Sequence, residues 1–417
     1  MLKPVRQLAL EIVSKTLAGG FAKDFIQEVD RRRYKEEDLG LLQEIVFGTL
    51  QHHLYLSAVL DKFIREEPGK KPVDPDLRLL LETALYQIHF LDRVPNFAVV
   101  NESVNLAKKI HGYPAGSLVN GILRSILRDP KAFEIEEPHL RYSMPLEWLE
   151  VLKEDLPEDW EEFLKASTQR APFQIRSTKR DREQLAAALQ RAGYATEKTE
   201  HAPQGLTVKN PRGIFETRFF TDGYFYVQDE ASQLVPELFT PDPKAKALDL
   251  CAAPGGKAMA LATSHQSVVA NDISSERLKQ VKENKKRLGL QNIRTSRSKG
   301  EEFSLFGEKF DHILVDAPCS GLGLLRKKPE IKYHTSPQDA SQLSKIQLNL
   351  LNASVKHLKE QGEIVYSTCT VTRRENEDVV QSFLEEHEDF TLAEERRYFP
   401  HREGTDGFYM AKLVRKS

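Results

Sequence analysis

Cysteine is scarce in this sequence: a chain of 417 residues contains three, Cys251, Cys319 and Cys369. They are odd in number and widely spaced, which excludes a disulfide framework. There is also no Cys-x-x-Cys pair and no Cys/His cluster of the kind that binds structural zinc. We therefore expect free thiols in a reducing compartment and no metal.

Long hydrophobic runs are missing as well. No apolar stretch approaches the roughly 20 residues that cross a bilayer, and residues 1–15 (MLKPVRQLALEIVSK) lack the apolar core of a secretory signal. The formal net charge is −2, so composition gives no sign of a polyanionic partner, and a nucleic-acid site must be a local basic patch. We expect a cytoplasmic protein without membrane contact.

Hydrophobic periodicity divides the chain into three parts. Residues 1–128 carry apolar residues at helical spacing, as in VRQLALEIVSKTLAGG, and predict an all-α bundle. Residues 129–235 mix strand-like and helix-like segments and predict a linker with a small α+β module. In residues 236–417, apolar strands alternate with amphipathic helices, which is typical of a Rossmann-like α/β domain with a parallel sheet covered on both faces.

Each cysteine follows a short apolar run of this last part, in LDLCAAPGGK (248–257), VDAPCSGLG (315–323) and IVYSTCT (364–370). Parallel sheets bind ligands beyond the carboxyl ends of their strands, so all three thiols are expected at one edge. A strand-end cysteine is more often a small buried hydrophobe than a nucleophile, and the residues alone leave that alternative open.

The segment after Cys369, TVTRRENED, favours a reactive thiol. Thr372 and Glu375 have capping-box spacing, which predicts a helix N-terminus and two arginines close to the sulfur. Such surroundings lower the pKa of a thiol and increase the share of thiolate.

The segment LDLCAAPGGKAMALA predicts a strand, a glycine-bearing turn and a helix start. Gly255 and Gly256 let the backbone approach a ligand closely, and Asp272 ends the next strand near the spacing at which a carboxylate reaches ribose hydroxyls. The pattern indicates an adenosine-containing cofactor, although a glycine turn with an aspartate helix cap would look the same. A dehydrogenase is excluded because the Gly-x-Gly-x-x-Gly fingerprint is missing, and there is no Walker pattern.

A basic run, LRKKPEIK (325–332), lies beside the proposed site. A charged run is normally a solvated surface, but its position next to DAPCSG makes contact with RNA phosphates an equal alternative.

Several of these segments resemble the signature sequences of S-adenosylmethionine-dependent RNA cytosine-5 methyltransferases: LDLCAAPGGK, VDAPCSGLGLLRKKPEIKY, YSTCT and GTDGFYMAKL. Residues 1–128, with VPNFAVVNESVNLAKKI and LVNGILRSILRD, resemble the NusB-type RNA-binding helical domain. YVQDEASQLV (226–235) is similar to the family's lead-in to the catalytic domain. The combination resembles the bacterial Fmu/Sun (RsmB-like) family, which methylates 16S ribosomal RNA, over nearly the whole chain.

The resemblance implies methyl transfer from S-adenosylmethionine to C5 of a cytosine in 16S ribosomal RNA. Attack of a thiolate on C6 would make C5 nucleophilic, and the target must be single-stranded or flipped out. By resemblance, Cys369 attacks, Cys319 assists release, Asp316 hydrogen-bonds the base near N3, and Lys257 orients cofactor or base. A monomer with RNA as its partner is expected.

The cofactor is expected to bind the glycine-bearing loop and two strand-end carboxylates. Cys251 would line this pocket without a catalytic role for its sulfur. One departure concerns the aspartate that usually contacts the adenine, because Lys299 stands in its place and only Glu301 or Glu302 could substitute. The expected cofactor-binding residues are Cys251, Ala252, Ala253, Pro254, Gly255, Gly256, Lys257, Asp272 and Asp316.

Two alternatives keep part of this assignment. The same reaction could act on transfer RNA or another ribosomal RNA, since only the N-terminal part favours 16S. A non-catalytic RNA-binding assembly factor is favoured by Lys299 alone, and the joint presence of Cys369, Cys319, Asp316 and Lys257 argues against it.

Overall fold

The computed structural model describes residues 3–64, 72–305 and 307–416. The chain forms two compact units: Met1–Thr168 with Leu325–Ser336, and Gln169–Leu324 with Pro337–Ser417. The backbone therefore passes from one unit to the other three times. We call Leu325–Ser336 the inserted segment, because it lies within the second half of the sequence but belongs to the first unit.

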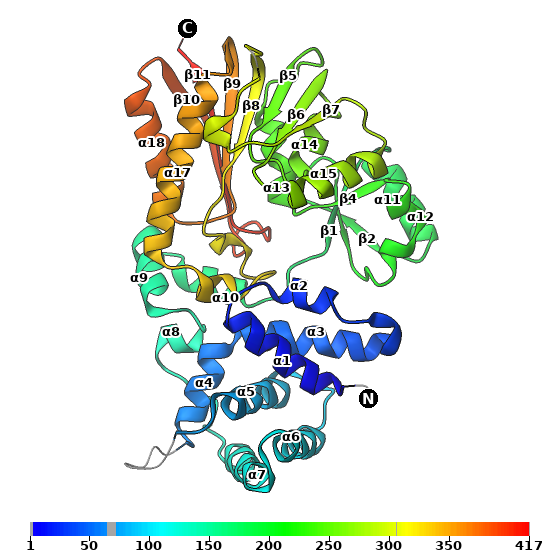
Figure 1. Cartoon of the computed structure of the whole chain (residues 1–417), viewed down its shortest axis with the longest axis vertical. Helices are drawn as coiled ribbons and strands as arrows, with labels where there is room; N and C mark the ends of the chain where they lie inside the picture. The colour runs from blue at the N-terminus through cyan, green and yellow to red at the C-terminus, as the bar shows by residue number, and fades with distance from the viewer. Residues whose placement is uncertain (1–2, 65–71, 306, 417) are drawn as a thin grey trace. The chain divides into compact units, whose positions relative to one another are not determined.

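The first unit is helical, as predicted for residues 1–128 (blue to cyan in Figure 1). Its helices form because apolar residues recur every three or four positions; α1 (Val5–Leu17) buries Ala9, Ile12, Val13 and Thr16 against its neighbours. Further helices of this unit are α2 (Ala22–Gln27), α3 (Glu36–Gln51), α4 (His53–Asp61), α5 (Pro75–Phe90), α6 (Asn96–His111), α7 (Tyr113–Arg128), α8 (Pro138–Arg141), α9 (Leu146–Asp155) and α10 (Trp160–Ser167).

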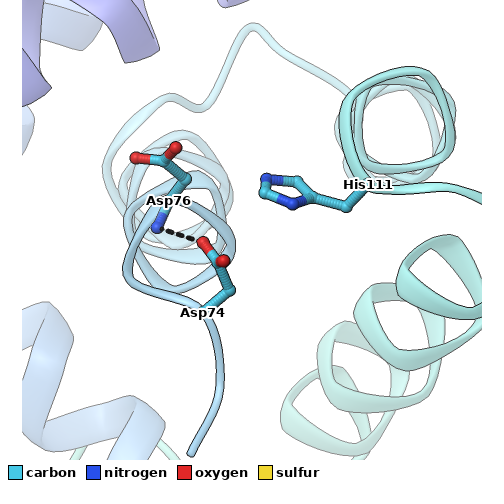
Figure 2. A group of neighbouring side chains, drawn as sticks. All are labelled: Asp74, Asp76 and His111. Atoms are coloured by element: carbon cyan, nitrogen blue, oxygen red, sulfur yellow. Dashed lines mark hydrogen bonds between the residues drawn. The ribbon is translucent and has the colours of Figure 1, made fainter.

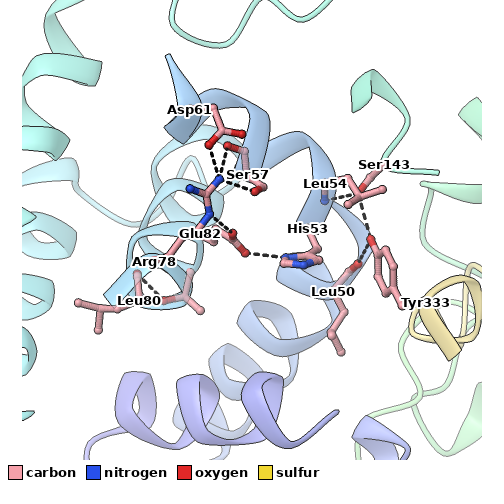
Figure 3. Close-up of polar contacts among 11 residues, drawn as sticks. Leu50, His53, Leu54, Ser57, Asp61, Arg78, Leu80, Glu82, Ser143 and Tyr333 are labelled. Atoms are coloured by element: carbon pink, nitrogen blue, oxygen red, sulfur yellow. Dashed lines mark hydrogen bonds and ion pairs between the residues drawn. The ribbon is translucent and has the colours of Figure 1, made fainter. Parts of the chain in front are cut away.

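The inserted segment contributes the short helix α16 (Ile331–His334) to this bundle. Lys332 Nζ donates to the carbonyl oxygen of Gln51 at 2.7 Å, and Tyr333 Oη donates to that of Leu50 at 2.9 Å (Figure 3). Both carbonyls lie in the last turn of α3, where no intrahelical donor is left. The two side chains therefore cap the C-terminal end of α3.

The next residue of α16 caps a second helix. His334 Nε2 lies 2.7 Å from the carbonyl oxygen of Thr16, in the last turn of α1, and donates to it. The indole of Trp148 in α9 donates to the carbonyl of Thr335 at 2.8 Å. Three consecutive side chains of a distant segment thus donate to helix ends of the first 168 residues: two to otherwise open carbonyls of α3, and one to the Thr16 carbonyl, which also accepts from the Gly19 amide.

The second unit begins with the small α+β module. Its antiparallel sheet has the strand order β2-β3-β1-β4, and its core contains Ile175, Leu206 and Phe225. The elements are β1 (Gln174–Ser177), α11 (Arg182–Arg191), β2 (Thr196–Lys198), β3 (Gly205–Val208), α12 (Arg218–Thr221) and β4 (Phe225–Val227).

The large sheet has the order β10-β11-β9-β8-β5-β6-β7, in which β9, β8, β5, β6 and β7 are parallel. This confirms the predicted Rossmann-like α/β fold. The antiparallel strands β10 and β11 at one edge were not predicted, because β10 is charged (FTLAEERRY) and lacks an apolar run. The strands are β5 (Lys246–Asp249), β6 (Ser267–Asn271), β7 (Ile293–Ser296), β8 (Phe310–Asp316), β9 (Leu358–Thr368), β10 (Phe390–Tyr398) and β11 (Phe408–Arg415).

Helices cover both faces of this sheet (Figure 1). Successive residues of a strand point to opposite faces, so in β5 Ala247 packs into one core and Leu248 into the other. Because both faces are buried, the strands are continuously apolar, and only their ends are free to carry polar side chains. The covering helices are α14 (Gly256–Leu261) and α15 (Ser275–Leu288) on one face, and α17 (Pro337–Val355) and α18 (Glu377–Glu386) on the other.

Candidate active site at the carboxyl edge of the large sheet

The site lies where the strand order reverses. From β5 the chain moves to β6 and β7 on one side and returns to β8 and β9 on the other. Asp249 ends β5 and Asp316 ends β8, so two carboxylates stand at the switch point, where parallel sheets bind ligands.

Asp316 and Lys257, both predicted to be catalytic, form an ion pair. Lys257 Nζ lies 2.7 Å from Asp316 Oδ2, and Ser367 Oγ donates to Asp316 Oδ1 at 2.8 Å. The lysine is buried, with its ammonium over the ring of Phe408 at 5.1 Å from the centroid. Both oxygens of Asp316 are therefore held in fixed directions. Ser367 was missed because a serine inside an apolar strand carries no functional signal.

Cys319 and Cys369 come together, although 50 residues separate them in the sequence. Their sulfur atoms are 3.3 Å apart, and both residues are half-buried free thiols. The hydrogen bond with Cys369 raises the pKa of the Cys319 thiol well above its ordinary value, and burial and the nearby Glu375 raise it further. Cys319 is therefore a neutral thiol at pH 7 that can donate to its neighbour.

The GTDG motif (404–407) is linked to the backbone of Cys369 by hydrogen bonds through Gly323. The Gly323 amide donates to the carbonyl oxygen of Cys369 at 3.0 Å, and the Gly407 amide donates to that of Gly323 at 2.9 Å. A Cβ on Gly323 would lie 2.0 Å from the Gly407 oxygen, and one on Gly407 would lie 2.6 Å from Val371. Only glycine fits at either position, which explains why the GTDG motif ends in glycine and packs against Gly323.

The capping box predicted after Cys369 does not form. Neither Thr372 nor Asn376 caps a helix with its side chain, and α18 starts only at Glu377. Glu375 turns inward instead and accepts hydrogen bonds from Ser320.

The two arginines are also directed elsewhere. Arg373 lies 3.5 Å from Asp378, and Arg374 donates to the carbonyl of Pro337. Both guanidinium groups therefore have partners elsewhere in the fold, and the predicted cationic surroundings of the thiol stay a prediction.

The predicted cofactor loop connects β5 to α14. Gly255 has φ of 104°, a left-handed conformation that favours glycine. Asp272 is buried beside the loop and accepts from the Ala253 amide at 3.1 Å and the Ser274 amide at 2.9 Å. Arg277 lies 3.4 Å from the same carboxylate. Sequence analysis did not predict this residue as part of the site, because the charged pattern of its helix is typical of a solvent-exposed helix. Asp272 thus fixes the loop predicted to bind the cofactor.

Cys251 lies in the same loop as an unreactive thiol. Burial raises its pKa well above the ordinary value, and Asp249 and Asp316 add to this effect. Thiolate is therefore disfavoured at this position, in keeping with the expectation that Cys251 has no catalytic role.

Asp249 is a polar group that sequence reasoning missed. It is 1% exposed, and neither of its carboxylate oxygens has a hydrogen-bond partner among the described residues. Burial raises its pKa to about 8, with Asp316 as the next cause. An unpaired buried carboxylate at the carboxyl edge of a parallel sheet is typical of a functional site, and the signal was present as a strand-end aspartate in LDLC.

Lys299, which stands where an adenine-contacting aspartate is usual, points to solvent and pairs with Glu302 at 3.0 Å. Both side chains are exposed, at 57% and 66%. Glu302 is therefore engaged with the lysine, and Glu301 is the residue left to substitute for the aspartate.

The basic run at 325–332 does not form a continuous RNA-facing loop. It belongs to the inserted segment, where Lys332 is 1% exposed and capped onto Gln51. Lys328 is exposed and lies over the ring of Phe21 at 5.5 Å. The end of the run is part of a helical core, so phosphate contact stays a prediction for its first residues alone.

One group of three potential metal ligands is present in the described part of the chain: Asp74, Asp76 and His111 (Figure 2). Asp74 Oδ1 accepts from the Asp76 amide and caps α5. The Asp74 carboxylate thus has a structural role as a helix cap. No helix among the described residues is long and apolar enough to cross a membrane.

Comparison with known proteins assigns each part of this architecture. The NusB family matches residues 3–128, the ferredoxin-like domain of RsmF/B-like methyltransferases matches residues 144–214, and the 16S rRNA methyltransferase RsmB/F matches residues 236–414. A Bacillus subtilis protein, probable ribosomal RNA small subunit methyltransferase B, is 35% identical, with 99% of each chain covered. The chain belongs to the RsmB/F family of 16S rRNA methyltransferases.

A further relative and two solved structures are similar to this chain over most of its length. Ribosomal RNA small subunit methyltransferase B of Vibrio cholerae is 33% identical over 93% of this chain and 92% of its own. A methyltransferase homologue from Pyrococcus horikoshii is 26% identical with a TM-score of 0.61, covering 67% of this chain and 98% of that one. NSun6 from the same organism, solved with the cofactor analogue SFG, shares the fold at 23% identity and a TM-score of 0.60, over 66% of this chain and 99% of its own. The RsmB/F family member described here is thus an S-adenosylmethionine-dependent ribosomal RNA methyltransferase.

Proposed function

We propose that this RsmB/F family member methylates C5 of a cytosine in 16S ribosomal RNA through a covalent adduct between Cys369 and C6 of the base. The observation that carries the proposal is the pair of thiols 3.3 Å apart. One group must bond C6 and a second must act at the adjacent C5, and two thiols in contact meet that requirement. A single structural cysteine would need no such neighbour.

The residues divide the reaction as follows. The Cys369 sulfur attacks C6, the ring electrons move toward C5, and N3 takes up a hydrogen bond from an acid at the base edge. Asp316 would carry the proton of this acid and hold the base edge, since Lys257 and Ser367 fix the directions of its two oxygens. After C5 has gained the methyl group, its proton is removed, the C5–C6 double bond re-forms, and Cys369 leaves as thiolate.

The assignment of the two thiols follows from their protonation. Cys319 has a raised pKa and is neutral at pH 7, so it is the poorer nucleophile. It can donate a hydrogen bond to the Cys369 sulfur. A neutral thiol cannot itself take up the C5 proton, so Cys319 assists release by holding a water molecule that carries this proton to solvent.

The cofactor fits the free carboxylate at the switch point. S-adenosylmethionine supplies an electrophilic methyl group on a sulfonium and carries a second positive charge on its amino group. Asp249, buried and unpartnered among the described residues, is suited to such a cation. Asp272 would accept from the ribose hydroxyls, and the backbone of residues 251–256 would line the pocket.

Trapping the adduct tests the roles of the cysteines. Cys319→Ala is expected to attack the base and transfer the methyl group but to release it poorly, so protein should accumulate joined to RNA. Cys369→Ala and the double variant should form neither adduct nor product. Denaturing gels of each variant with 16S ribosomal RNA and S-adenosylmethionine separate these cases, with Glu385→Ala, an exposed site on α18, as the control.

The opposite pattern would reassign the chemistry. A shifted band for Cys369→Ala alone would mean that the two roles are exchanged. Full activity of Cys369→Ala without a band in any variant would exclude covalent catalysis. Product analysis by mass spectrometry, with transfer RNA as the competing substrate, tests the base and the RNA class.

A further inference from the structure

Glu375 is a charged residue with no part in the mechanism above, yet it is completely buried close to both thiols. Its Oε1 accepts from the Ser320 amide at 2.7 Å and from Gln347 Nε2 at 3.2 Å. Its Oε2 accepts from Ser320 Oγ at 2.5 Å and from Thr372 Oγ1 at 3.0 Å. Four donors satisfy the buried charge, so the carboxylate is fixed in place.

Two of these four donors come from the loop that carries Cys319. Ser320 directly follows the cysteine and is held by both its amide and its hydroxyl group. Gln347 of α17 also donates to the carbonyl of Pro318, the residue before the cysteine, at 2.9 Å. Glu375 and Gln347 therefore fix the chain on both sides of Cys319.

The neighbour of Glu375 holds the other cysteine in the same way. Asn376 Oδ1 accepts from Thr368 Oγ1 at 2.5 Å, and Asn376 Nδ2 donates to the carbonyl of Thr370 at 3.2 Å. Thr368 and Thr370 flank Cys369. Two consecutive residues, Glu375 and Asn376, thus hold the flanks of both cysteines.

We propose that Glu375 is a positioning residue that sets the distance between the Cys319 and Cys369 sulfur atoms for methyl transfer. The functional part of this inference rests on the proposed covalent mechanism. Because C5 and C6 are neighbouring ring atoms, the two thiols must remain a few ångströms apart throughout the reaction, and a small displacement costs rate rather than affinity.

The four donors allow two substitutions to distinguish the position of the Glu375 side chain from its charge. The two donors to Oε1 are N–H groups that can only donate, whereas both donors to Oε2 are hydroxyl groups that can also accept. Glu375→Gln can therefore place its carbonyl at the first position and its amino group at the second, and it keeps all four contacts without a charge. Glu375→Asp keeps the charge but is one methylene too short to reach Ser320.

Cross-linking of the thiols by dibromobimane measures their spacing without RNA or cofactor. The wild type, Glu375→Gln and the exposed control Glu385→Asp should cross-link Cys319 to Cys369 at rates within twofold of one another. Glu375→Asp should cross-link at least tenfold more slowly. Its kcat should fall by at least tenfold while its KM for RNA and for S-adenosylmethionine stays within twofold, and Glu375→Gln should restore kcat.

The reverse order, with Glu375→Asp like the wild type and Glu375→Gln impaired, would overturn the proposal in favour of a charge effect. Equal cross-linking in both variants would also overturn it. If the expected cross-linking order holds but no variant, the wild type included, methylates cytosine or forms an adduct, the positioning of the thiols stands and the proposed function fails.

Discussion

Three aspartates at the edge of the sheet differ in what neutralises them, and this difference separates their roles. Asp316 has an ammonium and a hydroxyl group, Asp272 has two backbone amides and the Arg277 guanidinium, and Asp249 has no hydrogen-bond partner among the described residues. A carboxylate with a cation or hydrogen-bond donors beside it needs no ligand, whereas a buried carboxylate without partners is stabilised by a cation that binds in the site. Cofactor binding should therefore depend on Asp249 in a way that responds to pH.

We expect binding of S-adenosylmethionine at pH 7 to release about one proton from Asp249. The pKa of this carboxyl is raised to about 8, so it is mostly protonated at pH 7 in the free protein and must ionise beside a cation. Calorimetry in two buffers with different ionisation enthalpies measures the release. Asp249→Asn should bind without releasing this proton, and equal release by both proteins would contradict the role of Asp249.

Asp272→Ala should weaken binding of S-adenosylmethionine by roughly 1.5–3 kcal/mol, the range for hydrogen bonds to a charged group. The loss has two sources, since the carboxylate would hold the ribose and also accepts from the Ala253 amide. Calorimetry checks the affinity. The matched control is Glu276→Ala, an exposed site on α15. An unchanged affinity would refute the ribose contact.

Among the elements of the fold, the inserted segment departs most from its local sequence. A run of arginine and lysine before a proline is typical of an exposed loop, yet Lys332, Tyr333 and His334 each donate to the end of a helix. The acceptors lie about 280 to 320 positions earlier in the chain. No short-range pattern can reveal such a partner.

Lys332 should make the stability of the first unit increase with pH. Burial lowers its pKa to about 7, below the ordinary 10.5. Between these values the unfolded chain holds a proton that the folded chain has lost, so stability rises as pH increases from 7. Relative to Lys332→Met, the wild type should gain up to about 1.4 kcal/mol per pH unit between pH 8 and 9.5.

Urea unfolding followed by tryptophan fluorescence tests this expectation. Both tryptophans of the chain, Trp148 and Trp160, lie in the first unit, so the signal reports on that unit. Stability curves of wild type and Lys332→Met that run parallel over this pH range would show that the lysine is not buried in its neutral form.

The elements that sequence predicts correctly are those whose patterns are local. Apolar strands such as HILVD in β8, alternating with amphipathic helices, predict the parallel sheet, and the strand ends then predict one edge with Cys319, Cys369 and Asp316. Glu375 was misassigned because its spacing to Thr372 fits a cap equally well. Whether this glutamate caps a helix or turns into the core is decided by Ser320, a residue 55 positions away in the sequence.

At the scale of the whole molecule, the first unit is discontinuous in sequence. A fragment of residues 1–168 should therefore lack the three side-chain donors, Lys332, Tyr333 and His334, that contact the ends of α1 and α3. Loss of three hydrogen bonds, at about 1 kcal/mol each, should lower its melting temperature by on the order of 5–10 °C relative to the same unit in the full chain.

A peptide of residues 325–336 added to this fragment should raise its melting temperature in a concentration-dependent manner, because the peptide binds only the folded form. It should also change the fluorescence of Trp148, which donates to Thr335. A peptide with Lys332→Met and Tyr333→Phe serves as the control. A fragment as stable as the intact unit, with no response to peptide, would show that the segment adds nothing.

The discontinuity also orders events while the protein is being made. Residues 1–168 leave the ribosome first, but the segment that closes their helix ends follows only after residues 169–324 have been synthesised, a delay of roughly 8–30 s at bacterial rates of elongation. A nascent chain therefore cannot complete its NusB-like half until the loop with Cys319 has already been translated. Products of premature termination before residue 325 would therefore carry a first unit of lower stability than that of the complete protein.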